Sequence, residues 1–144
     1  MDSPLIVLTD APEAGELETI RQQLDRFNIE ASGIDDRLPL AVLAKDPVTQ
    51  EVLGGVTGRT SRGILFVDMF FLPDSMRGSG LGSKLLQMAE QEARRRGCRT
   101  ALLYTNDFQA PGFYIKHGWR EYGTFPCDPP GSSRIFFCKD LSAS

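Results

Sequence analysis

Residues 64–72, Ile64-Leu65-Phe66-Val67-Asp68-Met69-Phe70-Phe71-Leu72, form an apolar run in which Asp68 is the one charged residue. Because the side chains on both faces of such a run are apolar, it predicts a strand in the middle of a sheet. Pro73 follows, and Arg77-Gly78-Ser79-Gly80-Leu81-Gly82 then leads into a segment with helical periodicity. One face of that expected helix carries Leu81, Leu85, Ala89 and Ala93.

Two more strand-like runs precede this stretch, over residues 38–45 and 51–59. The connections at Asp46-Pro47 and at Ser61-Arg62-Gly63 are short enough for antiparallel hairpins. The three runs together therefore predict a β-meander.

The N-terminal part of the chain predicts one strand and one helix. Leu5 to Thr9 is an apolar run of strand length, and Asp10-Ala11-Pro12-Glu13 is a plausible helix start. The apolar residues that follow recur at helical spacing and predict one apolar stripe: Leu17, Ile20, Leu24 and Phe27.

Downstream, Gly97 is expected to end the long helix as a C-cap. Residues 100–105 then predict a strand, 111–117 a short helix closed by Gly118, and 119–125 and 134–139 two further strands. The order is βαβββαβαββ. It predicts an α+β fold with a mixed, mostly antiparallel sheet of six to seven strands, helices on both faces, and a single domain over residues 1–144.

The composition of the chain argues against several classes of function. The 144 residues carry a net charge of -3 and the pI is about 5.2, so broad binding to nucleic acid is not expected. Three cysteines and one histidine make a metal site improbable. No apolar run reaches transmembrane length and Met1-Asp2-Ser3-Pro4 does not resemble a signal peptide, which predicts a cytoplasmic protein, alone or as a homodimer.

The glycine-rich turn is a candidate anion site. The N-terminus of a helix leaves backbone N–H groups without partners and carries partial positive charge. Gly78, Gly80 and Gly82 keep side chains away from those amides, and Arg77 can add a charge at the rim. A tight strand-to-helix turn also needs glycine for conformational reasons alone, so both interpretations stay open.

Two nucleotide-binding motifs fail on detail. A Walker loop needs Gly-Lys followed by Ser or Thr, whereas Ser83 separates Gly82 from Lys84. A dinucleotide fingerprint needs a third glycine at position 83 and should open a βαβ unit rather than follow a meander. A nucleotide-binding module is therefore a weaker hypothesis.

Two segments resemble the GCN5-related N-acetyltransferases. Leu72 to Gly82, with Arg-x-x-Gly-x-Gly leaving a strand, is similar to that family's acetyl-CoA pyrophosphate motif. Ala110 to Trp119 resembles the family's Ala-x-x-Phe-Tyr-x-x-x-Gly-(aromatic) segment. The resemblance implies an enzyme that moves an acetyl group from acetyl-CoA directly to a primary amine in a ternary complex, without a metal.

The resemblance also implies where the cofactor binds. The strand over 64–72 should splay away from the strand over 100–105, and pantetheine should insert there as if it were a strand. Its backbone partners would be Phe70, Phe71 and Leu72. The pyrophosphate would be held by the amides of Arg77, Gly78, Ser79, Gly80, Leu81, Gly82 and Ser83.

The resemblance places two catalytic groups. Asp68 matches the position of an acidic residue that acts as base, often through water, and Tyr114 matches the usual proton donor to the leaving thiolate. The alternatives are that Asp68 is a structural carboxylate bonded to nearby groups and that Tyr114 is a structural tyrosine of the core. His117 stands where the family is usually apolar and Asp107 where asparagine is common, so the roles of Asn106, Asp107 and His117 are unassigned.

The acceptor is a small molecule or a protein amino group, and the sequence does not decide between them. The family builds its acceptor site from regions that correspond here to 27–38 and 126–133, which contain the carboxylates of Glu30, Asp35, Asp36 and Asp128. These favour a cationic acceptor. The competing hypothesis is a noncatalytic module that binds acyl-CoA and senses it.

Overall fold

The computed structural model describes residues 2–142, and the chain divides after Asp35 into two compact units. In the first unit, helix α1 spans Ala14–Ser32. It begins with a capping box, in which the side chains of Glu13 and Glu16 each accept from the other's backbone N–H. It ends at Gly33, whose positive φ of 73° lets its N–H bond the carbonyl of Ile29.

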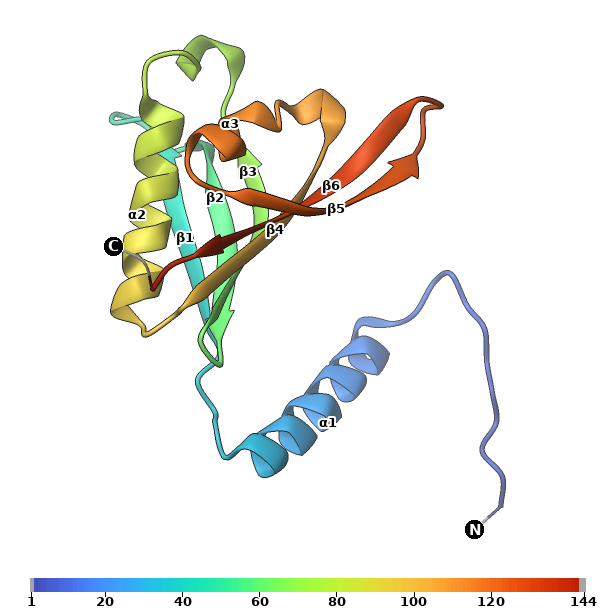
Figure 1. The fold of residues 1–144 in the computed structure, drawn as a ribbon. Helices are drawn as coiled ribbons and strands as arrows, with labels where there is room; N and C mark the ends of the chain where they lie inside the picture. Colours follow the sequence, from blue (N-terminus) through green and yellow to red (C-terminus); the bar gives the residue numbers. More distant parts are fainter. Residues whose placement is uncertain (1, 143–144) are drawn as a thin grey trace. The chain divides into compact units, whose positions relative to one another are not determined.

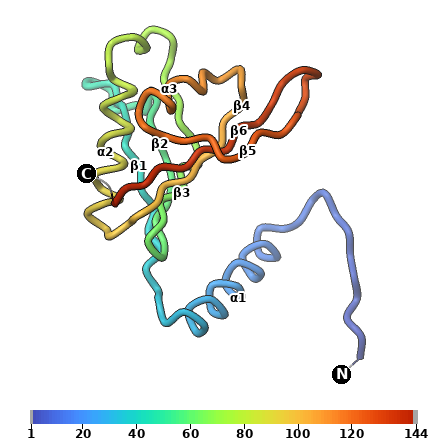
Figure 2. The backbone as a smooth tube through the Cα atoms, in the orientation of Figure 1, coloured from blue at the N-terminus to red at the C-terminus, as the bar shows by residue number. Residues whose placement is uncertain are grey.

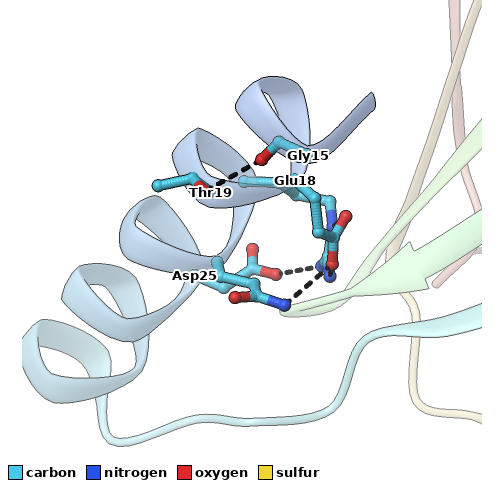
Figure 3. A network of polar contacts seen from close by, with 6 residues as sticks. Gly15, Glu18, Thr19 and Asp25 are labelled. Atoms are coloured by element: carbon cyan, nitrogen blue, oxygen red, sulfur yellow. Dashed lines mark hydrogen bonds and ion pairs between the residues drawn. The ribbon is translucent and has the colours of Figure 1, made fainter. Parts of the chain in front are cut away.

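Helix α1 has a polar side tied together by its own side chains. Arg21 bonds Glu18 and Asp25, and Thr19 bonds the carbonyl of Gly15 at 2.9 Å (Figure 3). The expected apolar stripe has the predicted helical spacing, and its side chains are exposed: Leu17, Ile20, Leu24 and Phe27.

The predicted strand at Leu5 to Thr9 is wrong. These residues are described and form no strand, and Leu5, Ile6 and Leu8 are exposed. A strand needs a neighbouring backbone to pair with. The described part of this first unit offers one helix and no second extended segment.

The second unit is a six-stranded sheet in the order β1-β2-β3-β4-β6-β5 (Figures 1 and 2). All neighbouring pairs are antiparallel except β3 and β4, which are parallel. This confirms the predicted mixed, mostly antiparallel sheet. The strands are β1 (Leu38–Lys45), β2 (Val52–Ser61), β3 (Ile64–Phe71), β4 (Thr100–Asn106), β5 (Arg120–Cys127) and β6 (Ser132–Asp140).

Helices of this second unit cover one face of its sheet. They are α2 (Leu81–Arg95), which connects β3 to β4, and the short α3 (Gly112–Lys116). The buried side of α2 includes Leu85, Ala89 and Ala93, as its periodicity predicted, whereas Leu81 is only partly buried. Leu86 and Glu90 are also buried and were not predicted. Gly97 has φ of 86°, so Cys98 N–H can bond the carbonyl of Ala93 and close the helix.

Side-chain alternation separates the two faces. Leu65 and Val67 on β3 and Leu103 on β4 are buried on the helix side. On the opposite face, Tyr104 and Phe71 are more than half exposed, and no helix within residues 36–142 covers them. Within residues 2–142, no helix is long and apolar enough to span a membrane.

A buried ion pair ties α2 to the last strand. The Glu90 side chain is 4% exposed, and its carboxylate lies 2.6 Å from the Lys139 ammonium. The indole N–H of Trp119 donates to the same carboxylate at 3.3 Å, and Arg94 lies 3.9 Å away. A carboxylate this deeply buried needs such partners because its desolvation is costly.

We expect Lys139→Met to lower the free energy of unfolding by about 3 kcal/mol, because it leaves Glu90 buried without its nearest cation. Urea denaturation measures the loss, and Lys116→Met, at an exposed lysine on α3, is the matched control. A loss no larger than that of the control would mean that Trp119 and Arg94 satisfy Glu90 by themselves.

Candidate active site

Strands β3 and β4 separate soon after they meet. Their parallel pairing covers three residue pairs, from Ile64↔Thr100 to Phe66↔Leu102, and then stops. β3 continues to Phe71 against β2, and β4 continues to Asn106 against β6. The edge of β3 from 67 to 71 is therefore open toward β4 among the described residues, as the expected splay requires.

The glycine-rich turn leads from the end of β3 into α2. Gly78 and Gly80 have φ of 80° and 84°, a left-handed conformation that disfavours other residues. Gly80 is the N-cap of α2, and no side chain caps it. The first helical bond is Lys84 N–H to the Gly80 carbonyl, so the amides of residues 81–83 have no partner within residues 2–142.

Gly82 differs from the two turn glycines. A Cβ built at Gly82 would lie 3.5 Å from the Phe113 ring and 3.6 Å from the Leu72 side chain, which are ordinary contacts. Neither strain nor a clash within the chain therefore requires glycine at this position. The conformational explanation accounts for Gly78 and Gly80 but not for Gly82.

Arg77 folds back onto the turn instead of reaching outward. Its Nε donates to the Leu72 carbonyl at 2.8 Å, and its Nη1 lies 2.7 Å from the Asp74 carboxylate. Its guanidinium also lies 5.9 Å from the Phe71 ring centroid. The side chain thus braces the loop between β3 and α2, where the 3-10 turn η1 (Asp74–Met76) lies.

The three residues expected to contact pantetheine differ in their surroundings. Phe70 packs on the helix side against the rings of Phe113 and Tyr114, whereas Phe71 is 57% exposed on the other face. Leu72 is buried, and its carbonyl already accepts from Arg77.

Tyr114 lies on α3 among aromatic rings. The centroid distances are 5.4 Å to Phe113, 5.7 Å to Phe137 and 6.0 Å to Trp119. Burial raises the pKa of Tyr114 to about 12. The phenol therefore carries its proton throughout the neutral range, as a proton donor must.

Asp68 lies at a β-bulge in β3. Thr57 on β2 faces Met69 and Gly58 faces Val67, so Asp68 is the extra residue of β3. Its Oδ1 accepts from Arg59 Nη1 at 2.9 Å, and its side chain is 48% exposed. Arg59 also lies over the Phe66 ring, which belongs to the face away from α2. Asp68 and Tyr114 thus lie on opposite faces of the sheet.

Sequence reasoning did not identify Arg59 as the partner of Asp68. A regular hairpin register pairs Arg59 with Phe66, as is observed. The residue two positions later, Asp68, lies diagonally across the strand pair, within reach of the long Arg59 side chain.

The residues left unassigned have clear contacts. Asn106 and Gln109 form a capping box on the 3-10 turn η2 (Asp107–Gln109), and the Asp107 carboxylate accepts from Ser133 N–H at 3.1 Å. Both residues therefore order the end of β4 and the start of β6. His117 ends α3 and contacts Ser83 of α2 through its ring, 2.9 Å from Nε2 to Oγ.

One carboxylate expected to favour a cationic acceptor has a structural partner. Asp36 accepts from the backbone N–H of Arg62 at 3.0 Å, which anchors it to the β2–β3 turn. Asp128 lies in the turn between β5 and β6 and is exposed.

The remaining reactive groups do not form a second centre. Within residues 2–142, no group of three His, Cys, Asp or Glu side chains is arranged to hold a metal ion. Burial raises the pKa of the Cys98 thiol, which makes it a poor nucleophile. One hollow, of about 770 Å³, lies between β1 and the later turns of α2 at Leu43, Met88 and Arg95, away from the glycine-rich turn.

Comparison with known proteins agrees with this geometry. Residues 8–119 match the model of the acetyltransferase (GNAT) family. The chain is 37% identical over 118 residues to acetyltransferase Atu2258 of Agrobacterium fabrum, covering 82% of this chain and 85% of the relative. It is 40% identical over 92 residues to the blasticidin-S acetyltransferase of Streptomyces morookaense, covering 63% and 68%.

Solved structures share the fold. A crystal structure from Agrobacterium tumefaciens, described as an acetyltransferase, superposes with a TM-score of 0.88 at 34% identity, covering 95% of this chain and 99% of that one. A Bacillus anthracis structure in complex with acetyl coenzyme A shares the fold alone, with a TM-score of 0.58 at 16% identity, covering 77% and 66%.

The raised pKa of Tyr114 predicts a specific loss of stability in alkali. Because the folded pKa of about 12 exceeds the ordinary value of 10.0, the unfolded chain releases this proton first. Between these two values, the wild type should lose about 1.4 kcal/mol per pH unit relative to Tyr114→Phe. Urea denaturation from pH 8 to 11 measures the difference, with Tyr122→Phe as control. Parallel curves for wild type and Tyr114→Phe would contradict the assignment.

Proposed function

Because the chain belongs to the acetyltransferase (GNAT) family and is an acyltransferase, we propose that it moves an acetyl group from acetyl-CoA directly to a primary amine. The observation that carries the proposal is that the amides of residues 81–83, at the start of α2, have no partner within residues 2–142, together with the opening between β3 and β4. These two features suit the diphosphate and the pantetheine arm of one cofactor.

In this proposal, the turn from Gly78 to Ser83 holds the diphosphate through its main-chain amides, since the Arg77 N–H already donates to the Asp74 carbonyl at 3.2 Å. Arg77 itself acts on the loop rather than on the anion, since its guanidinium is bonded to Leu72 and Asp74. The open edge of β3, including Phe70 and Phe71, offers backbone groups to pantetheine. When bound, acetyl-CoA supplies the thioester that the amine attacks.

The two catalytic groups would act on opposite sides of the reacting carbon. A lysine-like amine has a pKa near 10.4, so making it neutral at pH 7 costs roughly 4 to 5 kcal/mol. Asp68, half exposed on one face, can accept that proton directly or through water. Tyr114, protonated on the other face, can donate to the departing thiolate. A direct transfer needs both groups at once.

The acceptor is proposed only as a class. Asp128 is exposed between β5 and β6, so its carboxylate still favours a cationic amine. Asp36 does not add to this preference, because its carboxylate accepts from the backbone N–H of Arg62. The blasticidin-S acetyltransferase among the relatives makes blasticidin S the first compound to test. A noncatalytic acyl-CoA sensor would bind the cofactor without amine-dependent release of thiol.

We expect a panel of primary amines to include one that releases free CoA thiol with the wild type. Tyr114→Phe should lower kcat about 100-fold with little change in KM for acetyl-CoA, because it removes the proton donor. Asp68→Asn should lower kcat at neutral pH. The reduction in kcat should be smaller at high pH, where the amine is already neutral. Tyr122→Phe is the control. Unchanged kcat in both site variants would remove the two catalytic assignments.

Ligand-induced thermal stabilisation tests the cofactor site separately. At 100 times its dissociation constant, acetyl-CoA should add roughly 2.7 kcal/mol of stability, and ATP or NAD should add less. Ser79→Asp should reduce the effect, because a carboxylate at the turn competes with the diphosphate for the same amides. Gln87→Asp, at an exposed position of α2, is the matched control. Stabilisation by ATP above that by acetyl-CoA would favour a nucleotide-binding module.

A further inference from the structure

His117 is held rigidly at the end of α3. Its backbone N–H donates to the Tyr114 carbonyl at 3.0 Å, and its own carbonyl accepts from Lys139 Nζ at 2.7 Å. Its imidazole packs on the Phe113 ring with centroids 4.7 Å apart. Lys139 is fixed in turn by the buried Glu90. These contacts fix the position of the imidazole and therefore its contact with Ser83.

Ser83 lies in the first turn of α2, where the helix amides lack partners. The side chains of Ser83 and His117 come from segments 34 residues apart, and both are partly buried. A serine hydroxyl has one proton to donate and two lone pairs that accept. The proton of the Ser83 hydroxyl can go either to His117 or to an anion at the turn, but not to both.

The anion decides between these arrangements. If Nε2 of His117 carries a proton, it donates to Ser83 Oγ, and the Ser83 proton is free to point at a phosphate oxygen. If Nε2 lacks a proton, it takes the Ser83 proton, and Ser83 then presents only lone pairs to a negative charge. A bound diphosphate therefore favours the first arrangement.

We propose that His117 is a positioning residue for the cofactor diphosphate, acting through a donor chain from His117 Nε2–H to Ser83 Oγ and from Ser83 O–H to a phosphate oxygen. The inference rests on the proposed function and deepens it, because it gives His117 a role in binding the diphosphate. The apolar residue that is usual at this position could not perform that role. It also connects the diphosphate turn to α3, the helix that carries Tyr114.

The test compares two acetyl donors. Acetyl-CoA has the diphosphate, and S-acetyl-pantetheine has the same thioester without it. His117→Leu and Ser83→Ala should each raise the dissociation constant of acetyl-CoA about tenfold, the loss expected of one hydrogen bond to a charged group. Binding of S-acetyl-pantetheine should be unchanged. Because both variants break the same chain, the double variant should bind acetyl-CoA no more weakly than either single variant.

His117→Gln is the rescue variant, since its amide N–H₂ can donate to Ser83, and it should recover most of the affinity. Calorimetry supplies the dissociation constants, so the test does not depend on turnover. Equal losses with both donors, multiplicative losses in the double variant, or no recovery with His117→Gln would overturn the proposal. Wild type that binds acetyl-CoA but releases no thiol with any amine would instead overturn the transferase proposal alone.

Discussion

The short parallel contact between β3 and β4 is the constraint on which the rest of the second unit depends. Three residue pairs join β1–β3 to β4–β6, and beyond them the strands part. The crossover helix α2 also links the halves, since it packs on β1–β3 and its Glu90 binds Lys139 of β6. The fold can therefore leave a strand edge open in its middle without losing its core, and that edge is where the candidate site lies.

Polar contacts on the helix side give this site its rigidity. Glu90, buried on α2, binds Lys139 of β6, and Lys139 holds the carbonyl of His117 at the end of α3. His117 then reaches back to Ser83 at the start of α2. These bonds form a closed circuit through α2, β6 and α3. Tyr114 and the glycine-rich turn are thereby held in one frame, although neither contributes to the ion pair.

The two faces of the sheet supply different chemistry. On the helix side, aromatic packing desolvates Tyr114 and keeps its phenol protonated. On the other face, Asp68 binds Arg59 across the β2–β3 pair and is half exposed to solvent. Burial suits a group that must hold its proton, and exposure suits one that must exchange it with water.

The sequence by itself determined the elements whose signals are local. The apolar run at 64–72, the periodicity from Leu81 to Ala93 and the glycines at helix ends specify β3, α2 and their junction, since each depends on neighbouring residues alone. The features that depend on contacts between residues far apart in the sequence are determined by the tertiary structure. Residues 5–9 have the composition of a strand but form none, Asp68 contacts Arg59 across the β2–β3 pair, and the Ser83–His117 bond joins residues 34 apart. Such contacts are fixed by register and packing, which no local pattern records.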